Sequence, residues 1–390
     1  DFNSVSIVEP NIIALKWLGF WRSSNSDSFF NSKWYNTYTI VMLFFQTMFI
    51  VTGFWYLYDK RQNLNIEDIN SVMFIYSANT INVVMMVNIY FNIDMIHFIQ
   101  SNMQAAAFQP KTSAEAAESK KWKNTARMFQ KVFFINNSIC AVMSLFISLL
   151  NGNKLVLAAH VFPGLNWKVF FIYQVVMNTA GAQMCATYVT LVTSLLIEII
   201  IQFCLLERSL QEMEDYEDLK TCIQWHLDIL VFIKKVQRFC GIGVSAVFAC
   251  GVFNICTSLA LVIEVDHSEL LFLLPYLLAM VAIIYCHSWC GSEVTYQSDK
   301  LSYAIFSSKW IDSDTAYKKL IHIYILLTKQ PLVIRLGGGT FDASLPVFVT
   351  LKLPILNRLP KSSHVPSTSK SIGGIQTTTS KSSVVGSMSQ

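Results

Sequence analysis

The side chains that could support chemistry in this sequence lie in or beside apolar runs. Glu198 stands in a long apolar run, and an ionisable group inside a membrane span is a candidate functional residue by default. The run is longer than a bilayer requires, so we favour the alternative that the helix has already left the membrane at Glu198. Cys286 and Cys290 share one helix face, with His287 beside them. A zinc site usually has four ligands, and because no fourth is evident we expect no bound metal.

Two further polar residues are interpreted structurally. We expect His226, in the segment CIQWHLDIL, to make a hydrogen bond within a helical connector rather than to act as a base. Asn136 begins an Asn-Asn-Ser glycosylation sequon, but it falls at the cytoplasmic end of a predicted span, so we expect it to stay unmodified. The sequence contains no nucleophile elbow, P-loop or HExxH motif. We therefore expect neither enzymatic activity nor a cofactor.

The composition explains why such residues are few. Hydrophobic residues make up 53% of the 390 residues and charged residues 14%, whereas a soluble domain carries about 25% charged residues. Several windows of about 20 residues are almost free of charge, as a helix that crosses a bilayer requires. The chain is therefore predicted to be an all-α polytopic membrane protein. Its small cationic excess lies in loops beside the spans and indicates no nucleic-acid partner.

Apolar runs of suitable length predict seven transmembrane helices. The expected spans cover residues 40–58, 72–93, 129–150, 175–206, 242–263, 270–289 and 333–353. The corresponding regions are an N-terminal cytoplasmic segment with an interfacial helix (1–39), helices one to four (40–203), a connector (204–239), helices five and six (240–290), a second connector (291–332), helix seven (333–353) and a Ser/Thr-rich tail (354–390). The tail has little apolar surface to bury, so we expect it to be disordered.

Both connectors show helical periodicity, and we expect them to pack against each other. The apolar stripe of the first consists of Leu210, Met213, Leu219, Ile223, Leu227, Leu230 and Ile233. In the second, the segment from Asp312 to Asp314 interrupts the pattern. The apolar stripe after this interruption consists of Leu320, Ile323, Tyr324 and Leu327. Each stripe needs a partner helix, which the other connector can supply.

The distribution of Lys and Arg predicts the orientation in the membrane. The segment before the first span, the loop between spans two and three, and the two connectors together carry eighteen of these residues, whereas the opposite side carries four. Cytoplasmic loops of membrane proteins carry the excess of positive charge. The N-terminus is therefore predicted to be cytoplasmic and the seventh span to end outside, which is the reverse of a G-protein-coupled receptor.

With this topology, the stretch from Cys286 to Leu351 resembles the C-terminal signature of the insect odorant receptor family. The matching blocks are Cys290-Gly291-Ser292-Glu293, Leu301 to Trp310, Tyr317 to Leu320, Lys329 to Leu332, Gly337 to Gly339 and Ser344 to Phe348. They occur in the family's order and spacing. Weaker agreement covers the rest of the chain, including its length and its long fourth helix. The sequence is similar to a divergent ligand-tuning subunit rather than to the longer shared co-receptor.

The resemblance implies an odorant-gated, non-selective cation channel of four subunits. It implies that this chain pairs with the co-receptor (Orco) in a heterotetramer, in the plasma membrane of olfactory sensory neuron dendrites. It also implies that the connectors form a cytoplasmic anchor domain and that helix seven lines the pore, with Phe348, Leu351 and Lys352 as expected pore-lining residues. After Leu351 the sequence departs from the family, because Pro354 and Pro360 break the helix.

The resemblance further implies that a volatile odorant binds in the outer half of the bundle, between helices two to six. Binding is expected to move helices five and six outward and open the pore. Such a site should be apolar with one or two orienting polar groups. The expected ligand-binding residues, chosen by their depth, are Phe74, Ser77, Ala78, Met143, Phe146, Ile147, Leu150, Met184, Tyr188, Thr257, Leu261, Tyr276 and Met280. Lipid contact or core packing is the alternative role for each of them.

The sequence leaves other functions open. A gustatory-receptor-like ligand-gated channel would share the architecture, although the gustatory Thr-Tyr-x-x-x-x-x-Gln-Phe motif is absent from the last span. A metabotropic seven-helix receptor would need an external N-terminus, and a non-conducting variant would agree with the broken last helix. An intramembrane enzyme or a transporter would need several ionisable residues deep in the spans, and these are nearly absent.

Overall fold

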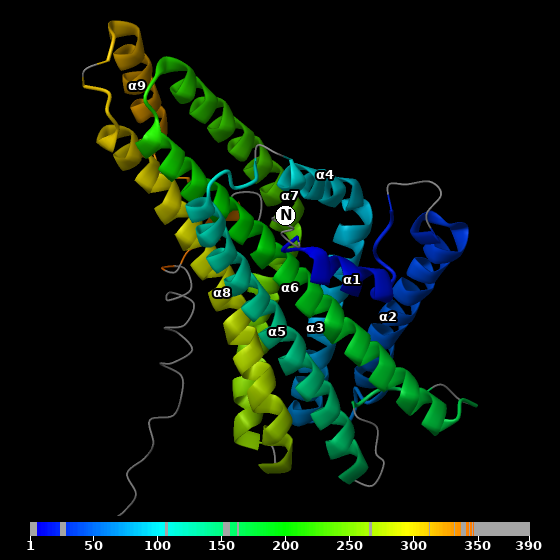
Figure 1. The fold of residues 1–390 in the computed structure, drawn as a ribbon. Helices are drawn as coiled ribbons and strands as arrows, with labels where there is room; N and C mark the ends of the chain where they lie inside the picture. Colours follow the sequence, from blue (N-terminus) through cyan, green and yellow to red (C-terminus); the bar gives the residue numbers. More distant parts are fainter. Residues whose placement is uncertain are drawn as a thin grey trace, which may run out of the picture.

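Long helices that run side by side form most of the molecule (Figure 1). This computed structural model describes residues 6–23, 29–105, 108–150, 157–161, 164–264, 267–311, 313–330, 332–336, 341–342, 344 and 346. Its elements are α1 (Glu9–Leu18), the 3-10 helix η1 (Phe29–Asn31), α2 (Lys33–Asp59), α3 (Ile66–Phe91), α4 (Ile93–Gln104), α5 (Ser113–Leu150), α6 (Trp167–Glu212), α7 (Tyr216–Glu264), α8 (His267–Ser307), α9 (Thr315–Thr328), β1 (Arg335–Leu336) and β2 (Phe341–Asp342). The predicted all-α fold is confirmed, with one short hairpin as the exception in the described part of the chain.

Five of the described helices are long and apolar enough to cross a membrane. They are Lys33–Asp59, Val72–Phe91, Trp167–Glu212, Tyr216–Leu259 and Leu273–Ser307. Predicted spans one, two, four, five and six overlap these segments. Predicted span three (129–150) is the C-terminal part of α5, which begins much earlier, at Ser113. The polar stretch before that span is therefore helical as well.

Helix α6 is the centre of the bundle. In its most apolar segment 94% of the residues are buried, whereas the value for α2 is 22%. Helices α1, α2, α3, α5, α7 and α8 all pack against α6 (Figure 1). A helix that is covered on all sides needs no polar face, which explains why the segment LVTSLLIEIIIQF carries a single charge. The outer helix α2 instead leaves apolar side chains exposed, as contact with lipid requires.

The short helix α1 packs one face against α6. Asn11 and Leu15 are fully buried, and Oδ1 of Asn11 accepts a hydrogen bond from the Thr190 hydroxyl at 2.6 Å. Trp17 is exposed on the opposite face. The helix ends at Gly19, whose φ of 89° is a left-handed conformation that glycine adopts without strain. The helix expected within the N-terminal segment 1–39 is thus packed against the bundle.

The two connectors meet where α7 packs against α9. The carboxylate of Asp314 caps α9 by accepting a hydrogen bond from the backbone N–H of Tyr317 at 2.9 Å, so the predicted interruption at Asp312 to Asp314 is confirmed. Nδ1 of His226 lies 3.1 Å from the Tyr324 hydroxyl. Burial raises the pKa of Tyr324 above its ordinary value and lowers the pKa of His226 to about 4, so both partners of this hydrogen bond are neutral. His226 is therefore hydrogen-bonded within the connector, as expected.

The predicted stripes of the connectors are wrong at Leu227, Ile323 and Leu327, all of which are exposed. The stripe of the first connector is otherwise confirmed, because Leu210, Met213, Leu219 and Ile233 are buried, together with Cys222, Trp225, Ile229, Phe232 and Val236. The buried face of α9 consists of Tyr317, Ile321, Tyr324 and Thr328, so it keeps the helical period but is rotated from the prediction. The indole of Trp225 is buried with its polar atom paired, because its Nε1 donates to Oε1 of Gln202 at 3.3 Å.

The predicted start of helix seven at residue 333 is wrong. Strand β1 pairs antiparallel with β2, with Arg335 opposite Asp342, and the Nε and Oδ1 atoms of these two side chains lie 3.8 Å apart. Glycine is a poor helix former, and three glycines follow β1 in the sequence, so a helix is disfavoured here. The expected pore-lining residues Phe348, Leu351 and Lys352, and the tail 354–390, lie outside the described residues.

Candidate ligand-binding cavity

A cavity of about 90 Å³ lies between five helices, α3, α5, α6, α7 and α8. It occupies the half of the bundle that contains the α5–α6 and α7–α8 connections. The lining residues are Ile75, Ala78, Asn79, Ile81, Asn82, Met85, Phe133, Asn136, Asn137, Cys140, Ala141, Asn178, Thr179, Ala182, Cys185, Ala186, Val247, Gly251, Tyr276, Ala279, Met280 and Ile283. Counted as spans, these helices are two to six.

Three of the predicted ligand-binding residues, Ala78, Tyr276 and Met280, line this cavity. Phe74 packs edge-on against Tyr276, with the ring centroids 4.4 Å apart. Ser77 is directed to α7 instead, where its hydroxyl donates to Oδ1 of Asn254 at 2.6 Å. Phe74 and Ser77 therefore support the helices around the cavity without lining it.

Other predicted residues of α6 and α7 lie away from the cavity. Met184 and Tyr188 are fully buried in the core, where the Tyr188 hydroxyl accepts a hydrogen bond from Nδ2 of Asn88 at 3.1 Å. Because α6 is covered on all sides, burial on this helix does not indicate which residues face the cavity. Thr257 donates to the backbone oxygen of Phe253 at 3.2 Å, within its own helix. The side chains of Ile147, Leu150 and Leu261 lie outside the described residues.

Helix α5 turns a different face to the cavity from the one predicted. Phe146 is 53% exposed, and Met143 lines a shallow groove on the outer surface of α5. Phe133, Asn137 and Cys140 line the cavity instead. Lipid tails are as apolar as the side chains of a protein core, so hydrophobicity alone does not distinguish the two faces of a membrane helix.

An amide-rich wall of the cavity was missed by the sequence reasoning. It consists of Asn79, Asn82, Asn136, Asn137 and Asn178. The asparagines within apolar spans could have indicated this wall, because polar side chains in membrane helices usually face the protein interior. Asn136 was expected at the end of a span. That expectation is corrected, because α5 extends back to Ser113 and Asn136 lies in the cavity wall.

Hydrogen bonds between amides join the helices around this wall. Nε2 of Gln46 donates to Oδ1 of Asn79 at 2.8 Å, and Nδ2 of Asn79 donates to Oδ1 of Asn178 at 3.4 Å. On the α5 side, Nδ2 of Asn137 donates to the backbone oxygen of Ala182 at 2.6 Å. These bonds hold α2, α3 and α5 against α6. The wall therefore has a defined geometry before any ligand binds.

The residues considered for chemistry lie outside the cavity. Glu198 is buried and accepts a hydrogen bond from Nε2 of Gln202 at 2.9 Å. His287 is also buried, and its Nδ1 lies 2.8 Å from the backbone oxygen of Ile283. Within the described ranges, no group of three or more His, Cys, Asp or Glu residues is arranged to hold a metal ion. The cavity is therefore suited to binding, and its wall offers amides and one phenol as polar groups.

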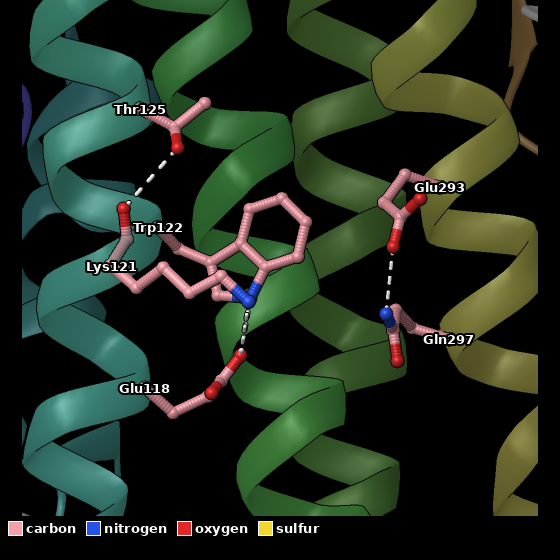
Figure 2. A network of polar contacts seen from close by, with 6 residues as sticks. All are labelled: Glu118, Lys121, Trp122, Thr125, Glu293 and Gln297. Carbon is pink, nitrogen blue, oxygen red and sulfur yellow. Dashed lines mark hydrogen bonds and ion pairs between the residues drawn. The ribbon is translucent and has the colours of Figure 1, made fainter.

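Away from the cavity, α5 and α8 continue together toward the connectors. The rings of Trp122 and Trp289 pack with centroids 6.1 Å apart. Figure 2 shows a polar pair on each helix, where Nε1 of Trp122 donates to Oε1 of Glu118 at 3.2 Å and Nε2 of Gln297 donates to Oε1 of Glu293 at 2.7 Å. Each pair is spaced i, i+4 and lies on a single helix. The two helices therefore contact each other through aromatic rings, while each carboxylate accepts a hydrogen bond from its own helix.

Comparison with known proteins identifies relatives of the chain. The model of the 7tm odorant receptor family matches residues 65–353. Odorant receptor 10 of Aedes albopictus is 24% identical over 197 residues, which are 47% of this chain and 52% of that one. Odorant receptor Or1 of Anopheles gambiae is 23% identical over 377 residues, covering 84% and 87% of the two chains. Odorant receptor 30a of Drosophila melanogaster, like the Aedes protein, is matched over only about half of its length, with 51% covered.

The same fold occurs in a solved structure, that of the insect olfactory receptor OR5 from Machilis hrabei in complex with eugenol. The TM-score is 0.80 at 14% sequence identity, and the match covers 90% of this chain and 95% of that chain. A second structure of the same receptor matches with a TM-score of 0.77 over the same shares of the two chains. At this level of identity the likeness establishes the fold alone.

Proposed function

This chain belongs to the 7tm odorant receptor family, and from that premise we propose that it is the odorant-binding subunit of an odorant-gated, non-selective cation channel. The single observation that carries the proposal is the cavity between α3, α5, α6, α7 and α8. Small-molecule sites are typically concave, mostly apolar and supplied with a few fixed polar groups. Apolar side chains such as Met280 and Ile283, combined with the amide wall, meet that description.

The proposed ligand is a small volatile molecule in contact with Ala78, Tyr276 and Met280. A protein cavity of about 150 Å³ can hold benzene. The cavity volume here is about 90 Å³, so a ligand of that size must displace a side chain such as Met280. Methionine adapts to such changes because it is unbranched and flexible. The complex of the structural relative with eugenol supports a small volatile ligand for this chain too.

We propose that gating starts from the two helices α7 and α8. Val247 and Gly251 of α7 and Tyr276 and Met280 of α8 line the cavity, so a ligand that expands it presses directly on both helices. Their outward movement would open a pore to which this chain contributes Phe348, Leu351 and Lys352. The proposed partner is the family's co-receptor (Orco) in a heterotetramer at the plasma membrane, with the N-terminus in the cytoplasm and the connectors as the anchor domain.

Whole-cell recording tests this function. Cells that express this chain together with the co-receptor should show odorant-evoked cation current, and cells with the co-receptor alone should not. No added current with both proteins at the cell surface, over a panel of compact volatiles, would contradict the proposal and favour a non-conducting role. A response through second messengers without current would favour the metabotropic alternative. Activation by sugars but not by volatiles would favour the gustatory-like alternative.

Substitution of Tyr276 tests the position of the site. Tyr276→Ala removes a ring that lines the cavity, so we expect the half-maximal odorant concentration to change by about tenfold or more, which corresponds to about 1.4 kcal/mol. Phe146→Ala is the matched control, because Phe146 is exposed on the outside of α5 and its removal should leave the dose-response curve unchanged. Equal effects of the two substitutions would exclude this cavity as the binding site.

A further inference from the structure

One amide of the cavity wall makes no hydrogen bond to the part of the chain that the structure describes. Asn82 lines the cavity and its side chain is only 4% exposed. Its amide makes no hydrogen bond to any residue that the structure describes. Its Nδ2 lies near the surface of α6, 3.0 Å from where a Cβ at Gly181 would stand. Asn82 thus offers both a donor and an acceptor at the edge of the cavity.

The neighbouring amides differ from Asn82 in this respect. Oδ1 of Asn79 accepts from Gln46, and its Nδ2 donates to the backbone oxygen of Ile75 at 3.0 Å and to Asn178. Nδ2 of Asn137 donates to the backbone of α6. These amides are held by other helices and serve the packing of the bundle. Asn82 forms no such bond between helices in the described part of the chain.

A ligand that covers an amide without bonding to it is penalised, because the amide loses its contact with water and nothing replaces it. A hydrocarbon ligand would impose that penalty at Asn82. A ligand with an oxygen atom would remove it by accepting from Nδ2 or, if it carries a hydroxyl, by donating to Oδ1. Other lining residues, Val247, Met280 and Ile283 among them, are apolar and suit a hydrocarbon body.

We propose that the cavity selects compact oxygenated volatiles, such as small ketones and alcohols, over hydrocarbons of the same shape, and that Asn82 makes the discriminating hydrogen bond. The proposal rests on the odorant-binding function proposed above. Specificity of this kind arises because the site was built with a polar group that the wrong ligand leaves unpaired. The size of the cavity restricts the class to small rings and short chains.

The test compares ligands that share a five-membered ring and differ in whether that ring carries an oxygen or a methyl group. Cyclopentanone, cyclopentanol and methylcyclopentane are applied to cells that express the full chain with the co-receptor, and binding is measured separately by the ligand-induced shift in thermal unfolding of the purified complex. We expect the two oxygenated ligands to be about tenfold or more stronger than the hydrocarbon, as one net hydrogen bond would make them. Equal potency of the three would overturn the inference and leave the odorant-binding function standing. No binding and no current with any of them would contradict both.

Asn82→Leu tests the residue itself, because leucine has a similar size and no hydrogen-bonding group. We expect it to lose the preference for the oxygenated ligands while keeping the response to methylcyclopentane. Thr80→Val is the matched control, since Thr80 lies on the same helix, is exposed, and bonds only to its own backbone at Tyr76. An unchanged preference in Asn82→Leu would overturn the assignment. If that variant does not reach the surface, Asn82→Ala and the comparison of ligands on the unaltered chain still decide the question.

Discussion

Gly181 lies where α6 approaches α3, and its missing side chain leaves room for three amide groups. A Cβ at this position would overlap Oδ1 of Asn79 and would lie 2.9 Å from Nε2 of Gln46 and 3.0 Å from Nδ2 of Asn82. Small residues let membrane helices come close enough for such contacts. The polar wall of the cavity therefore depends on one glycine of the central helix.

Gly181→Ala should destabilise the receptor by about 1–3 kcal/mol, because an added methyl group in a packed interior forces its neighbours to move. The thermal unfolding midpoint of the purified protein measures the effect. Gly241→Ala is the matched control: a Cβ at Gly241 meets nothing within 4 Å, and alanine is the better helix former. Equal midpoints for the two variants would show that the helices are not in close contact at Gly181.

At the same scale, the sequence predicted part of the cavity for a physical reason. Tyr276 and Met280 are spaced i, i+4, so they share one face of α8, and their depth could be read from the length of the apolar run. Phe146 was selected by the same criterion and lies on the outside. The depth of a residue in the membrane follows from the position of the apolar run. The side of the helix that faces the cavity depends on how the helix packs against its neighbours, and one sequence does not record those contacts. Asn82 and Asn136 indicated which side of their helices faces the interior, because amide side chains avoid lipid.

Among the elements, α7 joins the cavity to the connectors. Val247 and Gly251 line the cavity from one part of this helix, and His226 bonds to Tyr324 of α9 from another. Periodicity predicted helices on both sides of the membrane boundary, and the structure joins them into one. The hairpin of β1 and β2 was not predictable from periodicity, because two-residue strands are too short to show an alternating pattern.

The contact between α7 and α9 is tested by Tyr324→Phe. Loss of the hydroxyl leaves Nδ1 of His226 without its hydrogen-bond partner, so we expect a loss of about 1 kcal/mol in stability. Tyr303→Phe is the control, because Tyr303 is exposed on α8. The unfolding midpoint of the purified protein is the measurement, and a midpoint as high for Tyr324→Phe as for the control would mean that this hydrogen bond adds nothing to stability.

For the whole molecule, the distribution of charge agrees with the arrangement of helices. The C-terminal end of α6, the N-terminal end of α7, the C-terminal end of α8 and α9 lie at one end of the bundle (Figure 1). The basic residues Arg208, Lys220 and Lys318 belong to these segments, and Lys309 lies between α8 and α9. A basic end of a helix bundle is the one that stays in the cytoplasm. The order of spans one to six was predictable from the lengths of the apolar runs, whereas the hairpin that follows α9 was not.

Accessibility of tags checks this orientation. An epitope tag at the N-terminus should be stained in intact cells only after permeabilisation, because the N-terminus is expected in the cytoplasm. A tag in the connection between α5 and α6 should be stained without permeabilisation, since one more crossing separates each successive connection. Staining of the N-terminal tag on intact cells would reverse the topology and would return the chain to the metabotropic class of receptor.

The near-complete burial of α6 also bears on how such a receptor can acquire new ligands. After gene duplication, a substitution on this helix disturbs packing in several directions at once, so most changes there would be eliminated by loss of folding. Helices α3, α5 and α8 turn one side to the cavity and the other outward, and they can accept changes that reshape the site. Substitutions that change odour preference should therefore occur mainly on these three helices, while the sequence of the central helix changes little.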